Sequence, residues 1–222
     1  MPTPMRQAIA RYMTYSKQNI PHYYLHMRPE INTALNRREA WNAGKAKEEQ
    51  LSINDIIVKA VALALEQHPE FNGYYQDNAN RPQPAINLGI AIALPDGLIA
   101  PAILRCAGSP IDELAHRARD LAARARQGVL KAEEYSTATF TITNLGMYHV
   151  SGFAAIIVPP QVGILAVGAV EETPGLREGA LVAEQRVTLT LSGDHRATDG
   201  AEGARFLGDI VSCLQNPERL FG

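Results

Sequence analysis

The most informative stretch of this chain is Gly193-Asp-His-Arg-Ala-Thr-Asp-Gly200. Before it, residues 187–192 (VTLTLS) alternate between apolar and polar side chains, which predicts a strand. After it, residues 201–214 have the composition and length of a short helix. The stretch is therefore a strand-to-helix junction, and it carries a titratable imidazole, that of His195, on a loop that two rigid elements can aim.

Composition restricts the class of protein. The chain has 222 residues, of which 46% are hydrophobic and 20% charged, and no Ser-, Gly- or Pro-rich linker divides it. We therefore predict one domain over residues 1–222. The formal net charge of −2 provides no basic field for nucleic acid.

Location is predicted from what the sequence lacks. No apolar run is long enough to span a membrane, and the N-terminus has no apolar signal segment. The two cysteines, Cys106 and Cys213, do not form a C-x-x-C pair, so we expect neither a disulfide framework nor a zinc site. A reducing cytoplasm fits this composition best.

Four further segments have the pattern of helices. The first begins at Thr3-Pro4 and ends near Asn19-Ile20-Pro21, and the second covers residues 31–41. The third opens with Ser52-Ile-Asn-Asp55, which resembles a capping box, and stops at His68-Pro69. The fourth is capped by Ser109-Pro110 and ends at Gly128.

Strands are expected between these helices. Residues 86–94 and 98–104 read as a hairpin around Pro95-Asp-Gly97, with a bulge or a sheet edge at Pro101. The other predicted strands are residues 22–27, 137–143, 162–170 and 181–192. Because helices and strands are interspersed without strict alternation, we predict an α+β fold with helices packed on one face of a sheet.

The junction at residues 193–200 has two interpretations. A histidine is the natural general base near neutral pH, and Asp199, four residues later, could orient it. Alternatively, His195 is a core histidine and Asp199 is a carboxylate at a helix N-terminus. A metal pair is a third reading, but no further ligand has a suitable spacing, and His22 and His26 lie in an extended segment, so we predict no metal site.

Asp194-His195-Arg196 followed by Asp199-Gly200 resembles the motif D-H-R-x-x-D-G of the acyltransferase component of 2-oxo acid dehydrogenase complexes, a family that shares its fold with chloramphenicol acetyltransferase. Other stretches match the family in the same order along the chain: Met5–Arg11, Ser16–Gln18, Ile20–Tyr24, Pro95–Pro101, Thr139–Gly146, Ala155–Gln161 and Gly163–Gly168. The resemblance implies a two-layer α+β sandwich with a mixed sheet, like that of chloramphenicol acetyltransferase.

The resemblance also implies a reaction, the movement of an acyl group between coenzyme A and a dihydrolipoyl thiol. A free thiol has a pKa near 8.5, so it is mostly protonated at neutral pH, and His195 would remove its proton during attack on the thioester. Thr143 occupies the motif position of the oxyanion donor, although it could be an ordinary strand threonine.

Two further residues support this predicted site. Asp199 would hold the loop by pairing with Arg11, which could instead be a solvated helix residue. Asn144 would order the turn after Thr143 or assist the site. The lipoyl group is a partner substrate that is not attached to this chain.

Assembly follows from the same resemblance. In this fold the histidine and the hydroxyl residue come from adjacent subunits, so a homotrimer with interfacial active sites is expected, with lipoyl domains as partners. The trimers could stack into a cubic or larger shell. The C-terminal Leu220-Phe-Gly222 could supply an apolar contact between trimers.

The sequence also departs from the family. Members usually carry lipoyl domains and a peripheral-subunit-binding domain before this core, which here starts near Met1. The chain is therefore expected to lack both, either as a piece of a longer protein or as a free-standing enzyme, for which a tethered lipoyl donor is in doubt. Val158 replaces the usual Asn, and His26 and Tyr148-His149 are also atypical.

Two alternatives remain open. One is a free-standing acyltransferase that acylates a hydroxyl or thiol of a small molecule, in the manner of chloramphenicol acetyltransferase. The other is a non-catalytic trimeric assembly core. Turnover of acetyl-CoA separates the enzymes from the assembly core, and the choice of acceptor separates the two enzymes.

Overall fold

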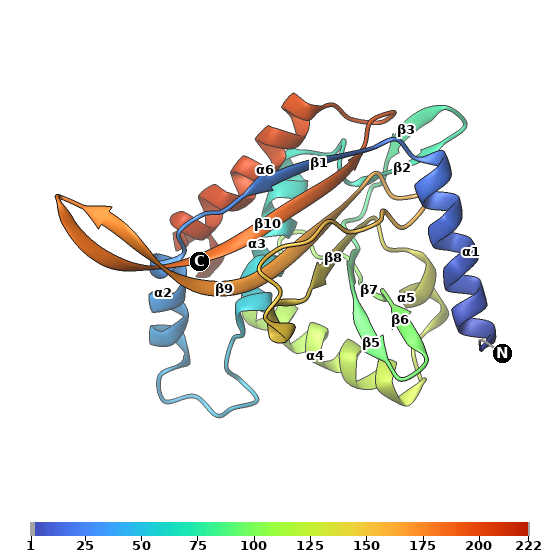
Figure 1. Cartoon of the computed structure of the whole chain (residues 1–222). Helices are drawn as coiled ribbons and strands as arrows, with labels where there is room; N and C mark the ends of the chain where they lie inside the picture. The colour runs from blue at the N-terminus through green and yellow to red at the C-terminus, as the bar shows by residue number, and fades with distance from the viewer. Residues whose placement is uncertain (1–2, 222) are drawn as a thin grey trace.

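The computed structural model describes residues 3–221, which fold around a six-stranded sheet in the order β1-β10-β9-β8-β4-β7 (Figure 1). Its strands are β1 (His22–Met27), β10 (Ala180–Asp194), β9 (Gly163–Arg177), β8 (Phe140–Asn144), β4 (Leu88–Ile90) and β7 (Ala102–Ile103). β8 runs parallel to both β9 and β4, whereas the other pairs are antiparallel. The predicted mixed sheet is confirmed.

One face of this sheet is covered by α2 (Asn32–Asn42), α3 (Ile53–Gln67), α4 (Ile111–Gln127) and α6 (Gly200–Gln215). Their apolar side chains and those of the strands form a single large buried cluster. At its centre the rings of Phe71 and Phe206 stack at 4.4 Å, and Phe140 meets Phe206 edge-on at 5.4 Å. The predicted α+β fold is confirmed, with these four helices packed on one face, while α1 (Pro4–Asn19) lies against the other.

Helix boundaries agree well with the sequence signals. Ser52 Oγ accepts a hydrogen bond from Asp55 N, and Asp55 Oδ2 accepts one from Ser52 N, so the capping box predicted for α3 is present. α1 (Pro4–Asn19) has Thr3 as its N-cap, and α4 ends at Gly128, whose φ is +72°. These local signals suffice because they satisfy helix-end backbone groups directly.

The expectation that Ser109 caps α4 is wrong. Pro110 occupies the N-cap position, and no side chain caps this helix. Ser109 has other partners, because its Oγ accepts from Arg117 Nη1 at 3.2 Å and its carbonyl accepts from Lys59 Nζ at 2.8 Å.

The strands differ more from expectation. The hairpin predicted at residues 86–104 is split, since β5 (Ile92–Leu94) and β6 (Gly97–Ile99) pair separately while β4 and β7 join the main sheet. Pro101 lies at the break beside the edge strand β7, as predicted. β8 begins at Phe140 rather than residue 137, because residues 132–136 form α5.

The sequence patterns did not predict four short elements, β2, β3, η1 and α7. β2 (Gly73–Gln76) and β3 (Ala79–Pro82) form a hairpin around Asp77 and Asn78, both with positive φ. A single 3₁₀ turn, η1 (Gly146–Tyr148), follows β8, and α7 (Glu218–Phe221) ends the described chain.

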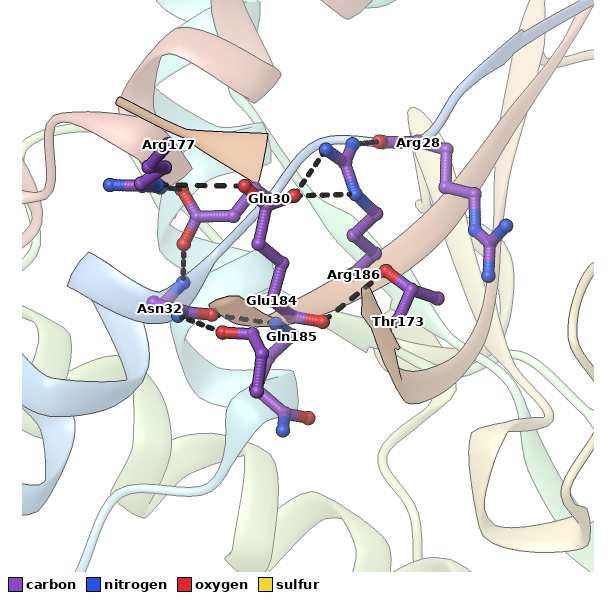
Figure 2. Close-up of polar contacts among 9 residues, drawn as sticks. Arg28, Glu30, Asn32, Thr173, Arg177, Glu184, Gln185 and Arg186 are labelled. Carbon is purple, nitrogen blue, oxygen red and sulfur yellow. Dashed lines mark hydrogen bonds and ion pairs between the residues drawn. The ribbon is translucent and has the colours of Figure 1, made fainter. Parts of the chain in front are cut away.

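β9 extends seven residues beyond the predicted strand of residues 162–170, whereas β10 closely matches the predicted residues 181–192. The two strands form a projecting arm at one end of the molecule, opposite α1 (Figure 1). The base of the arm is held by charged side chains (Figure 2). Glu184 contacts Arg186 at 2.5 Å and Arg177 at 3.5 Å, and Arg177 also contacts Glu30 at 2.9 Å. The Arg177–Glu30 contact joins residues 147 positions apart, so the sequence pattern alone did not reveal this support of the arm.

Leu220 and Phe221, near the C-terminus, pack against other residues of the same chain. Leu220 is fully buried in the helix-covered core, and the ring of Phe221 lies 5.7 Å from that of Trp41. Leu220 is therefore not free to insert into another trimer, contrary to the expected contact; Gly222 lies outside the described residues. Within residues 3–221, no helix is long and apolar enough to cross a membrane.

Candidate active site

The loop that carries His195 is pinned by its two neighbours in sequence. Asp194 is completely buried and binds Arg196 through both carboxylate oxygens, at 2.7 Å and 3.0 Å. Arg196 Nη1 also donates to Asn19 O, and His195 N donates to Pro21 O at 3.0 Å. The backbone of the loop is therefore fixed, while the imidazole of His195 remains exposed.

Tyr23 supports this imidazole, and sequence reasoning missed it. Its ring meets that of His195 edge-on at 5.3 Å, and its hydroxyl hydrogen-bonds Thr198 Oγ1 at 2.9 Å. Burial raises the pKa of Tyr23 to about 12. A Cβ at Gly193 would lie 2.3 Å from the Tyr23 ring, so the glycine that opens the motif makes room for this tyrosine.

Asp199 is the N-cap of α6. Its Oδ1 accepts hydrogen bonds from Ala201 N and Glu202 N, both at 2.8 Å. Glu202 Oε2 accepts one from Asp199 N, also at 2.8 Å, which completes a capping box. Hydrogen bonds from the helix backbone hold the pKa of Asp199 below its usual range. Of the two readings of Asp199, the structure bears out the helix-terminal one.

Thr143 lies on the face of the sheet opposite to α2, α3, α4 and α6. It is 9% exposed and lines a cavity of about 630 Å³. Most of the lining is apolar and includes side chains of α1, of β6 and of residues 153–158, among them Ile9, Met13, Leu98, Ile156 and Val158. Within residues 3–221 the hydroxyl of Thr143 has no hydrogen-bond partner, so it is free to donate to a ligand.

Asn144 orders the turn after β8, which was one of its two predicted roles. Its Oδ1 accepts from Gly146 N at 2.8 Å, and its Nδ2 lies 3.4 Å from Asn54 Oδ1. Arg11, by contrast, is exposed on α1 and forms no ion pair with any described residue. The expected Arg11–Asp199 pair is therefore absent from the single chain, in which Asp199 Oδ1 accepts two backbone N–H groups of α6.

His195 and Thr143 are far apart in one chain. Thr143 is opposite Ala166 of β9, which is opposite Thr190 of β10. His195 follows Thr190 by five positions, which corresponds to roughly 16 Å along a strand at about 3.3 Å per residue. A single chain thus provides both groups but does not bring them together.

No group of three or more His, Cys, Asp or Glu side chains within residues 3–221 is arranged to hold a metal ion. The groups that the structure offers at the site are the exposed imidazole of His195, the hydroxyl of Thr143 and the apolar cavity beside Thr143.

Comparison with known proteins places the chain in a family. The family described as 2-oxoacid dehydrogenases acyltransferase (catalytic domain) matches residues 2–222. The chain belongs to this family. It is 40% identical over 224 residues to the mitochondrial dihydrolipoyllysine-residue acetyltransferase component of the pyruvate dehydrogenase complex of Caenorhabditis elegans, and 36% identical over 218 residues to that component in Rhizobium meliloti.

These alignments cover 97% and 96% of this chain but only 44% and 49% of the relatives. The chain thus spans about half the length of the curated relatives it matches.

Solved structures agree with this assignment. The dihydrolipoamide acetyltransferase of Azotobacter vinelandii has a TM-score of 0.91 at 28% identity, and the cubic core of a pyruvate dehydrogenase complex has 0.91 at 29%; each comparison covers 99% of this chain and 92% of the other. Chloramphenicol acetyltransferase has the same fold, with a TM-score of 0.58 at 13% identity, covering 92% and 94%. The predicted fold family is confirmed.

Proposed function

We propose that this chain transfers an acyl group between coenzyme A and the thiol of a dihydrolipoyl group, and that acetyl is the first candidate for this acyl group. The observation that carries the proposal is the exposed imidazole of His195 on a loop fixed by the buried Asp194–Arg196 pair. The acetyl group is suggested by the names of the relatives, which are dihydrolipoyllysine-residue acetyltransferases.

Residue spacing supports the assignment of roles. In the Azotobacter vinelandii enzyme a serine, a histidine and an asparagine were investigated for their role in the catalytic mechanism. The serine precedes the histidine by 52 positions, and the asparagine follows it by four. Thr143, His195 and Asp199 have the same separations here. Serine and threonine both carry a donor hydroxyl, and asparagine and aspartate both cap helices.

His195 acts as the general base in this proposal. Its unprotonated nitrogen takes the proton of the attacking dihydrolipoyl thiol, while the sulfur bonds to the carbonyl carbon of the acyl-coenzyme A thioester. The tetrahedral intermediate then breaks its bond to the sulfur of coenzyme A. That sulfur takes the proton back from the imidazolium, so the products are the acyl thioester, free coenzyme A and neutral His195.

Thr143 stabilises the oxyanion that forms on the carbonyl oxygen during attack. Its hydroxyl has no partner among the described residues, and it opens on an apolar cavity. A hydrogen bond to developing charge is stronger in such surroundings than in water. Asp199 contributes by fixing the end of the His195 loop to α6, and it takes no part in proton transfer.

We further propose that the active site forms between copies of the chain in a homotrimer. The separation of Thr143 from His195 within one chain supports this arrangement. A lipoyl-bearing domain is the proposed partner. Stacking of trimers into a shell is compatible with the similarity to a cubic core. The cytoplasm remains the predicted location.

A second candidate is the acylation of a small apolar molecule. The cavity of about 630 Å³ beside Thr143 is large enough for such an acceptor and is lined mostly by apolar side chains. The same base would then deprotonate a hydroxyl or a thiol of that molecule.

The direct test is acetyl transfer from acetyl-CoA to dihydrolipoamide, with the thioester product detected by mass. We expect turnover by the wild type and a loss of about 10²- to 10⁴-fold in His195→Ala. His116→Ala, which changes an exposed histidine on α4, is the matched control. If the wild type binds coenzyme A but does not transfer the acetyl group to dihydrolipoamide, small molecules should be screened as acceptors. If it neither binds coenzyme A nor transfers the acetyl group, the non-catalytic assembly core is favoured.

Mixing variants tests the shared site. His195→Ala and Thr143→Val are each expected to be nearly inactive. If each site takes one residue from each of two neighbouring copies, an equal co-expressed mixture should recover about a quarter of wild-type activity, because random closed trimers contain that fraction of intact sites. No recovery would contradict an interfacial site.

A further inference from the structure

Residues 153–158 form one wall of the Thr143 cavity without belonging to any strand. Side chains of three other elements hold their backbone. Ser16 Oγ of α1 donates to Ile157 O at 2.6 Å, and Ser192 Oγ of β10 donates to Ala155 O at 2.7 Å. Ile157 N donates to His22 Nε2 of β1 at 3.0 Å. Ile156 and Val158, on either side of Ile157, line the cavity.

The two contacts of His22 determine its protonation state. Nδ1 lies 2.8 Å from Ile20 O, and a carbonyl oxygen can only accept, so Nδ1 carries a proton. Nε2 receives the N–H of Ile157, so Nε2 has none. The arrangement therefore requires a neutral imidazole with its proton on Nδ1.

Charged groups around His22 come from several elements. Lys17 of α1 and Arg196 disfavour the imidazolium, whereas Asp194 at the end of β10 favours it, and the Tyr24 ring stacks at 6.0 Å. Asp194 is already paired with Arg196. Burial lowers the pKa of His22 below its usual value of 6.5.

We propose that neutral His22 is a positioning residue that holds the cavity wall over Thr143, and that its protonation releases the wall and reduces acyl transfer as the pH falls. Protonated Nε2 would present an N–H to the N–H of Ile157, so the hydrogen bond would be lost. The effect on acyl transfer rests on the proposed function; the effect on the wall does not.

The segment that carries His22 also contacts the loop of His195. Pro21, which lies between Ile20 and His22 in the sequence, accepts the backbone N–H of His195 at 3.0 Å. The junction at residues 19–22 therefore holds both the cavity wall and the loop of the proposed base.

Two variants separate hydrogen bonding from shape and charge. His22→Phe keeps a planar ring but removes both hydrogen bonds. His22→Gln offers a donor and an acceptor that do not titrate near neutral pH. His116→Gln, on the exposed surface of α4, is the matched control.

The first measurement is independent of activity. Nitrogen NMR of the wild type at neutral pH should show His22 as the neutral Nδ1–H tautomer. Amide exchange at Ile157 should be about five- to tenfold faster in His22→Phe than in the wild type at the same pH, with His22→Gln close to the wild type. An Nε2–H tautomer, a charged imidazole or unchanged exchange would overturn the proposal.

The second measurement is the pH profile of acetyl transfer. His22→Phe should lose roughly 10- to 100-fold in kcat/KM through displacement of the wall. Wild-type activity should fall more steeply at acid pH than that of His22→Gln, because protonation of His22 is a cause of loss that only the wild type has. Equal slopes with an active wild type would refute the pH dependence, whereas an inactive wild type with intact Ile157 protection would refute only the proposed function.

Discussion

The two faces of the sheet are built from the same strands but differ in chemistry. In β8, Phe140 and Ile142 point into the helix-covered core, whereas Thr141 and Thr143 point to the other side. The second face is covered by α1 and by residues 149–162, most of which belong to no strand. Strand alternation thus separates the residues that stabilise the fold from those available for chemistry.

Two polar side chains on the second face bind the segment of residues 149–162 that covers it. Thr141 Oγ1 donates to Gln161 Oε1 at 2.7 Å, and Ser192 Oγ donates to Ala155 O. Thr143 differs, because it has no such partner among the described residues. We therefore expect substitutions on the helix-covered face to change stability and those at Thr143 to change catalysis.

The largest effect on stability is expected from Phe206→Ala. Phe206 is fully buried between Phe71 and Phe140, so the truncation should lower the free energy of unfolding by about 3–5 kcal/mol. Urea unfolding measures the loss. At a temperature where the variant remains folded, kcat should stay within about twofold of the wild type; a large fall in kcat with little loss of stability would contradict the separation of the two faces.

Thr143→Val should show the opposite pattern. The change keeps the branched shape and removes the hydroxyl, so kcat should fall by about 10²- to 10³-fold, equivalent to roughly 2.7–4 kcal/mol of barrier. The free energy of unfolding should change little, since the hydroxyl binds no described residue. Thr143→Ser is the control and should retain most activity; equal losses in both variants would indicate a packing role.

The smallest effect is expected at the junction that joins the two faces. Asp199→Ala removes the N-cap of α6 and should lower the midpoint of thermal unfolding by about 2–4 °C, whereas Asp199→Asn should preserve it. Thermal unfolding compares the two. If Asp199→Asn lost as much stability as Asp199→Ala, charge rather than capping would be responsible.

Stability should also depend on pH through His22. Its pKa is lowered in the folded state, so the unfolded chain binds this proton first as the pH falls below about 6.5. The stability that depends on neutral His22 is therefore complete above that value, and it decreases until the pH passes the lower folded pKa. His22→Gln should remove this component from a series of urea unfolding curves, while the matched control should keep it.

Local signals predicted the helices better than the strands. The Ser52–Asp55 capping box and Gly128 mark α3 and α4 because they satisfy helix ends within a few residues. The length of β9 was underestimated because Pro174 and Gly175 interrupt its pattern, and its support comes from ion pairs such as Arg177–Glu30. The hairpin of β2 and β3 was missed, and it too is attached to a remote segment, since Tyr75 N donates to Pro160 O at 2.8 Å.

For the site, the sequence by itself determined the family, the loop that carries His195 and the positions of Thr143 and Asn144, because these depend on motifs of adjacent residues. Only the tertiary structure decided that Asp199 caps α6 without Arg11, that Tyr23 supports the imidazole and that His22 holds the cavity wall. The hydrogen bond from Ile157 N to His22 Nε2 joins residues 135 positions apart. Such a contact depends on how distant segments pack together, and the periodicity of side chains along the sequence does not predict that packing.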